Sequence, residues 1–211
     1  MRFLDRKYII YSPFLIICIN IITALSFGKM MEKWVFIPII LIQWLLMALI
    51  ICVFSSQAQL IQWLQFPKKH FSWVILSVLV ALIPIPIFLK YHYLLNHWTI
   101  VIPWILIALI NPWMEEFFWR GLLSEATKKW STLHAALFSA LLFSINHIVF
   151  AIHSELFRGP EVFITTFIIG LIWGICFIKS KSLFWLVVAH FCVDFLNLSV
   201  PAFLDLFKPN L

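Results

Sequence analysis

Long apolar runs dominate this sequence of 211 residues. A helix needs about 20 mostly apolar residues to cross a bilayer. Four runs approach that length without a break, and three more contain interruptions. The runs are Tyr8–Phe27, Trp34–Ser55, Phe71–Leu89, Thr99–Trp113, Ser131–Phe150, Val162–Ile178 and Leu183–Leu198. We therefore predict an all-α, polytopic transmembrane helix bundle of about seven spans, within a range of six to eight.

The charge pattern indicates a membrane protein. Charged residues make up 11% of the chain, whereas a soluble domain carries about a quarter. The net charge of +6 does not indicate nucleic-acid binding, because the basic residues sit in short loops between apolar runs. With a cytoplasmic N-terminus, the inner loops carry Arg2, Arg6, Lys7, Lys68, Lys69, Arg120, Lys128, Lys129, Lys179 and Lys181. The outer loops carry Lys29, Lys33, Lys90, Arg158 and Lys208. This excess inside favours that orientation.

The chain reads as one membrane domain in three parts. Residues 1–98 hold N-terminal spans, residues 99–200 hold the segment with most of the polar chemistry, and residues 201–211 form a short C-terminal tail. The first apolar run is long and lacks a small-residue cleavage site, so we predict an uncleaved span. The compact chain suggests a multi-pass protein of a bacterial inner membrane.

Ionisable side chains inside apolar helices are costly and mark candidate functional sites. Three groups occur here. The first is Glu115, Glu116 and Arg120, the second is His147 with Phe143 one turn earlier, and the third is His190 with Asp194. Residues four apart share a helix face. Arg120 should therefore pair with Glu116 and leave Glu115 available for another partner.

The expected helices bring these groups to a similar depth. Pro112 should end one helix and start another that runs from Trp113 to about Lys129. A basic turn then leads into a helix over 132–150, which completes a hairpin. Measured from that turn, Glu116 lies about 21 Å along one arm and His147 roughly 24 Å along the other.

Two glutamates, an arginine, two histidines and an aspartate can perform hydrolysis. A carboxylate and a histidine can bind and deprotonate a water molecule, and a second histidine can stabilise an oxyanion. Alternatively, Glu115, His147, His190 and Asp194 could hold a divalent metal such as zinc. The sequence lacks H-E-x-x-H, which excludes a zincin helix.

The three groups resemble the motifs of the CPBP (Abi) family, which includes the type II CAAX prenyl endopeptidases. The family pattern is E-E-x-x-x-R, then F-x-x-x-H, then H-x-x-x-N/D. This chain has E-E-F-F-W-R at 115–120, F-S-I-N-H at 143–147 and H-F-C-V-D at 190–194, and Gly121 after the arginine also fits. The resemblance covers about residues 99–200.

The resemblance implies an α-helical intramembrane endopeptidase whose site lies in a cavity open to the cytosol. It assigns water activation to Glu115 and His147, oxyanion stabilisation to His190 and Asp194, and a supporting role to Glu116 and Arg120. The prenyl endopeptidases typically have Asn at the last motif position. An ionised Asp194 would repel an oxyanion, so it must be protonated or orient His190. The prenyl-protease branch favours no metal and no cofactor.

The same residues allow other functions. Glu116 and Arg120 could be a structural pair, and His190 with Asp194 could form the proton relay of a transporter. A non-proteolytic binding or immunity protein of the same fold is a further alternative. The expected partners are the lipid bilayer and a membrane-associated or lipidated peptide substrate of unknown identity, with no nucleic acid. The sequence leaves the substrate-binding residues unknown.

Overall fold

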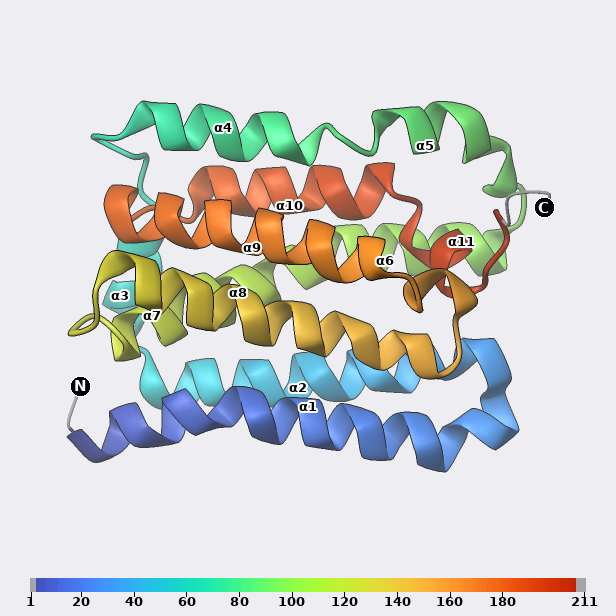
Figure 1. Ribbon diagram of the computed structural model, residues 1–211, viewed down its shortest axis with the longest axis horizontal. Coiled ribbons are helices and arrows are strands. Elements are labelled where there is room, and N and C mark those ends of the chain that lie inside the picture. Colours follow the sequence, from blue (N-terminus) through green and yellow to red (C-terminus); the bar gives the residue numbers. More distant parts are fainter. Residues whose placement is uncertain (1–2, 208–211) are drawn as a thin grey trace.

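The computed structural model describes residues 3–207, which form helices and no strand. The long helices lie roughly along one common axis (Figure 1). They are α1(Phe3–Met31), α2(Phe36–Phe54), α4(Phe71–Ala81), α6(Trp98–Glu115), α8(Thr132–Ile148), α9(Pro160–Ser180) and α10(Phe184–Leu196). Short helices between or after them are α3(Gln57–Trp63), α5(Ile85–Tyr91), α7(Leu123–Ala126) and α11(Ser199–Phe203). The predicted all-α class is confirmed.

Residues 1–2 and 208–211 lie outside the described part of the chain. They include Arg2 and Lys208, which the topology prediction counts, and the end of the predicted tail 201–211.

Apolar helices long enough to span a bilayer confirm an integral membrane protein. Five segments of residues 3–207 meet the length and composition needed: Asp5–Phe54, Phe71–Leu94, Trp98–Ala126, Thr132–Ile152 and Pro160–Ser180. The first holds both α1 and α2, which lie side by side and are joined at one end (Figure 1). The apolar α10 is shorter. The count of about seven spans is not confirmed and stays a prediction.

Two outer layers flank the helices that carry the polar groups. In Figure 1, α1 and α2 form one side of the bundle, α4 and α5 form the opposite side, and α6, α8, α9 and α10 lie between. The N-terminal end of α1, together with α3 and α7, lies at one end of the bundle, and α11 lies at the other. The polar groups of the C-terminal half therefore lie inside the bundle.

The predicted helix break at Pro112 was wrong. Helix α6 passes through Pro103 and Pro112 and ends at Glu115, and the chain continues as the π-helical segment η3(Glu116–Leu122) into α7. Proline removes one backbone donor, yet a membrane helix tolerates this because its surroundings satisfy the freed groups. By contrast, the chain does break before Pro84: α4 ends at Ala81, and Pro84 caps the start of α5.

The second arm of the predicted hairpin is present as α8. Ser131 caps its N-terminus, where the Ser131 hydroxyl accepts a hydrogen bond from the His134 amide. Helix α8 packs against α9 along its length. This packing places His147 near the far end of α8, where its side chain is half-buried.

The segment after α11 is folded onto the bundle, although the sequence suggested only a tail. Asp205 is buried and accepts hydrogen bonds from the Ser154 hydroxyl at 2.6 Å and from the Glu155 and Leu156 amides, both at 3.0 Å. Lys33 Nζ lies 2.9 Å from Asp205 Oδ2. Burial raises the pKa of Asp205, but these donors outweigh it and hold the pKa at about 2.

Candidate active site

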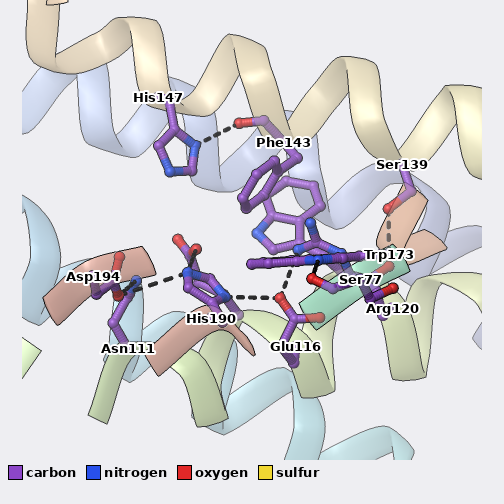
Figure 2. Close-up of polar contacts among 12 residues, drawn as sticks. Ser77, Asn111, Glu116, Arg120, Ser139, Phe143, His147, Trp173, His190 and Asp194 are labelled. Carbon is purple, nitrogen blue, oxygen red and sulfur yellow. Dashed lines mark hydrogen bonds and ion pairs between the residues drawn. The ribbon is translucent and has the colours of Figure 1, made fainter. Parts of the chain in front are cut away.

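Three separate parts of the chain bring the six predicted site residues together. Glu115 ends α6, Glu116 and Arg120 lie in η3, His147 lies on α8, and His190 with Asp194 lies on α10. All except His147 are buried. Figure 2 shows His190 between Glu116 and Asp194, with His147 on the opposite side of the group. Proximity of the three motifs is thus a feature of the structure, while their roles stay predictions.

The π-helical segment η3 presents Glu116 and Arg120 to the interior. Single π-turns within α-helices occur frequently at functional sites. Gly121 lies in this segment against the ring of Trp63 from α3, and a Cβ at Gly121 would lie 2.6 Å from that ring. The Trp63 ring is itself packed against Phe117 and Phe177. Glycine after the arginine therefore has a steric reason here.

Glu116 is the centre of the charged group. Its Oε1 lies 3.0 Å from Arg120 Nη1, the pair predicted from the four-residue spacing. The same oxygen accepts a hydrogen bond from His190 Nδ1 at 2.8 Å. Within residues 3–207 the Arg120 nitrogens make no aligned hydrogen bond, so this contact is a close ion pair.

Two aromatic rings enclose the Arg120 guanidinium. Its carbon lies 4.1 Å from the centroid of the Phe143 ring and 5.3 Å from that of Trp173. A cation this close to a ring face is attracted to it. Trp173 also contacts the His190 ring, with 5.1 Å between ring centroids. Phe143 of the second motif and Trp173 of α9 therefore support the charged pair directly.

The two carboxylate oxygens of Glu115 differ in their surroundings. Oε1 accepts a hydrogen bond from Gln43 Nε2 of α2 at 2.8 Å. Oε2 has no hydrogen-bond partner among the described residues and lies 3.5 Å from His190 Nε2. One oxygen is held in place, and the other is available to accept a proton.

One of the two ring nitrogens of His147 makes a hydrogen bond to the backbone. Its Nδ1 lies 2.8 Å from the Phe143 carbonyl oxygen on the previous turn. A carbonyl can only accept, so Nδ1 carries the hydrogen. In the neutral ring Nε2 is then the basic nitrogen, and no hydrogen bond of the described chain occupies it.

Asp194 contacts an amide that the sequence analysis did not select. Its Oδ2 accepts a hydrogen bond from Asn111 Nδ2 at 3.0 Å and lies 3.6 Å from His190 Nε2. Asn111 Oδ1 in turn accepts from Trp44 Nε1 of α2 at 2.9 Å. In the sequence, Asn111 stands out only as the residue before Pro112, and no local pattern links it to Asp194.

Two further amides were also missed. Asn20 of α1 and Asn146 of α8 are buried and bond to Gln43. A signal was present, because buried amides in apolar helices seek partners on neighbouring helices. Their long separation along the chain hid which partners those would be.

The alternative metal set does not form a ligand group. Among residues 3–207 no cluster of three or more His, Cys, Asp or Glu side chains is arranged to hold a metal ion. His190 Nδ1 is engaged by Glu116, and His147 Nδ1 is engaged by a backbone carbonyl. Nε2 is the ring nitrogen left over in both histidines, and that of His190 lies 3.5 Å from Glu115 Oε2 and 3.6 Å from Asp194 Oδ2.

A cavity of about 830 Å³ lies at the end of the bundle near α3. Its lining includes Asp5, Gln62, Trp63, Lys128 and Lys181, and none of the six predicted site residues. Trp63 lines this cavity and also packs against η3. The cavity is thus separated from the charged group by at least this side chain.

Part of the chain matches a known protein family. Residues 96–196 match the model of the family described as type II CAAX prenyl endopeptidase Rce1-like. The match contains all three motifs and confirms the relationship predicted from them. No curated protein and no solved structure shows a significant match to the chain. The matched family supports assignment as a hydrolase and as a membrane protease.

Proposed function

We propose that this integral membrane protein, related through residues 96–196 to the type II CAAX prenyl endopeptidases, hydrolyses a peptide bond of a membrane-associated or lipidated substrate. The observation that carries the proposal is the state of Glu115. One of its oxygens is held by Gln43, and the other has no hydrogen-bond partner among residues 3–207 and faces His190. A buried carboxylate with one oxygen free suits a general base.

In the proposed reaction Glu115 Oε2 accepts a proton from water as the water oxygen attacks the peptide carbonyl carbon. His147 Nε2 accepts the second hydrogen bond of that water and orients it. The C–N bond then breaks, and the proton passes from Glu115 to the leaving nitrogen. Support comes from the tautomer of His147, since its Nδ1–H is fixed by a carbonyl and Nε2 is left as an acceptor.

The oxyanion formed on the carbonyl oxygen needs hydrogen-bond donors. His190 supplies one from Nε2 in its imidazolium form, because Nδ1–H already donates to Glu116. Asp194 then orients His190 rather than contacting the oxyanion. Its bond from Asn111 Nδ2 supports this assignment, since Asp194 acts there as an acceptor.

Glu116 and Arg120 hold the charged group together. Glu116 Oε1 faces both Arg120 and His190, so it fixes the imidazole ring and compensates two cations. Phe143 and Trp173 keep the guanidinium between their rings. The proposed mechanism uses no metal, because Glu115 and His147 can bind and deprotonate the water by themselves.

We propose that the N-terminus is cytoplasmic. The excess of basic residues in the corresponding loops supports this orientation. The N-terminal end of α1 lies at the same end of the bundle as α3 and α7 (Figure 1), and the cavity at that end has polar lining residues.

The decisive experiment compares peptide termini in host membranes that express the wild type, Glu115→Gln or His147→Ala at matched levels. Fragments present only with the wild type are expected and would identify the substrate. His134→Ala is the matched control, because His134 is an exposed histidine on the same helix. Identical peptide sets in all strains would reject proteolysis and leave a binding or immunity protein of the same fold.

A further inference from the structure

Three buried amide side chains lie between the N-terminal helices and the charged group. Asn20 is on α1, Gln43 on α2 and Asn146 on α8, and each is at most 2% exposed. Asn20 and Gln43 lie outside residues 96–196, the part that matches the protease family. A polar side chain in an apolar span without a partner is expensive, so this cluster requires an explanation.

The hydrogen bonds of the cluster fix the orientation of Gln43. Its Oε1 accepts from Asn20 Nδ2 at 2.8 Å and from Asn146 Nδ2 at 2.8 Å. Asn20 Nδ2 also donates to Asn146 Oδ1 at 2.9 Å, so each of the three amide side chains is hydrogen-bonded to the other two. With its oxygen doubly occupied, Gln43 can present only its NH₂ group to Glu115.

Gln43 in turn determines which Glu115 oxygen is free. Its Nε2 donates to Oε1 at 2.8 Å and leaves Oε2 without a hydrogen-bond partner in the described chain. A donor on a carboxylate favours its ionised form. The bond therefore aims one defined oxygen of Glu115 at the reacting water.

The same three amides connect Glu115 and His147, the two proposed water-activating residues. Asn146 precedes His147 on α8, and Gln43 holds both Asn146 and Glu115. The position of α8 relative to the end of α6 is thus set through α2. Catalytic groups need such support, because small misplacements reduce activity strongly.

We infer that Gln43 is a positioning residue for Glu115, kept in its donor orientation by Asn20 and Asn146. The inference rests on the proposed function, since it assigns Glu115 the role of base. It gives the N-terminal half of the chain a direct part in the reaction. The competing explanation is purely structural, in which the amides only hold helices together.

A chemical probe of Glu115 separates these explanations without any substrate. Dicyclohexylcarbodiimide reacts with carboxyl groups in their protonated form and enters apolar sites. Labelling of Glu115 is followed by mass spectrometry of peptides from the full-length protein in membranes, over a series of pH values. We expect Gln43→Met to be labelled about tenfold faster than the wild type, because a hydrogen bond to a charged group is worth about that factor.

Two further variants complete the test. Gln57→Met, at an exposed glutamine that begins α3, should be labelled at Glu115 like the wild type. Asn20→Ala leaves the Gln43–Glu115 bond in place and removes donors that hold the Gln43 amide, so we expect a smaller increase. If Gln43→Met does not fold, Asn20→Ala carries the test. Wild-type labelling rates in a folded Gln43→Met or Asn20→Ala variant at every pH would overturn the inference.

The fragment assay distinguishes failure of the inference from failure of the proposed function. Faster labelling with no wild-type fragments would keep Gln43 as a partner of Glu115 and reject proteolysis. Wild-type fragments together with unchanged labelling and unchanged fragment yield in Gln43→Met would reject the positioning role and keep the protease. The inference expects faster labelling and at least about tenfold lower fragment yield in the same variant.

Discussion

His190 donates a hydrogen bond from Nδ1 to Glu116 Oε1 at 2.8 Å, although 74 positions of sequence separate the two residues. The same oxygen lies 3.0 Å from Arg120 Nη1. One carboxylate oxygen thus contacts an arginine on its own helical segment and a histidine from α10. Substitution of Arg120 or of His190 should therefore shift Glu116 and weaken its contact with the remaining partner.

Arg120→Met should destabilise the protein, because it removes the cation and strands the Glu116 carboxylate in the interior. Removal of one partner of a buried pair costs about 3 kcal/mol or more. We expect a lower melting temperature in detergent. Arg120→Lys should be intermediate, since it keeps the charge but loses the planar contact with Phe143 and Trp173. An unchanged melting temperature in Arg120→Met would show that the pair is not stabilising.

Part of this arrangement could be predicted from sequence, because short spacings on a helix have a fixed geometry. The spacing of Glu116 and Arg120 predicted their pair, and the basic turn predicted the start of α8. The three motifs predicted the family relationship, which the match over 96–196 confirms. Each of these predictions depends on local order along the chain.

What the sequence did not predict depends on contacts between distant helices. Gln43 and Glu115 are 72 positions apart, and no local pattern links them. The course of the chain through Pro112 into a π-helical segment depends on surrounding helices that satisfy the backbone. Burial of Asp205 was missed because the last residues carry a proline and charges and resemble a tail.

Gly121→Ala should destabilise the protein, because the new methyl group would lie 2.6 Å from the Trp63 ring. That ring packs edge-on against Phe117 and Phe177, so its displacement would disturb both contacts, and overpacking typically costs about 1–3 kcal/mol. Gly174→Ala is the control, since its methyl group would meet Ala136 at 3.4 Å, an ordinary contact. Thermal melts of both variants in detergent check this, and equal melting temperatures would contradict it.

Asp205→Asn should lower stability at neutral pH and have less effect in acid. The pKa of Asp205 falls from 3.8 to about 2 on folding, so its carboxylate stabilises the fold above pH 3.8 by on the order of 2 kcal/mol. This stabilisation is lost as pH falls toward 2. The melting-temperature difference between wild type and variant should therefore narrow between pH 5 and pH 2.5. A constant difference over that range would show that charge on Asp205 contributes nothing.

Chelators should leave peptide cleavage unchanged. In the proposed mechanism Glu115 accepts the proton of the water and His147 orients that water, so no step depends on a metal ion. Cleavage by purified protein in liposomes is measured before and after treatment with EDTA or 1,10-phenanthroline. Activity that is lost with both chelators and restored by zinc would contradict the metal-independent mechanism.

Asp194→Asn should retain cleavage, whereas Asp194→Leu should lose it. The side-chain oxygen of the introduced asparagine can accept the hydrogen bond that Asn111 Nδ2 now gives to Asp194 Oδ2 at 3.0 Å. The same oxygen keeps its place 3.6 Å from His190 Nε2, and no negative charge opposes the oxyanion that is proposed to form there. Leucine removes the acceptor that orients His190, so His190 is expected to donate poorly to the oxyanion. Loss of one oxyanion donor typically lowers kcat about a hundredfold or more.

The comparison separates two ways in which Asp194 can act. If Asp194 only orients His190 through a hydrogen bond, asparagine performs the same task and the initial cleavage rate stays within a few-fold of wild type. If its negative charge is needed to keep His190 protonated, Asp194→Asn falls to the rate of Asp194→Leu. Asn111→Leu provides the matched control, because it removes the amide that holds Asp194 in place and leaves the carboxylate itself unchanged. An Asn111→Leu rate between those of wild type and Asp194→Leu would support the orienting role, since Asp194 would then be present but less well fixed.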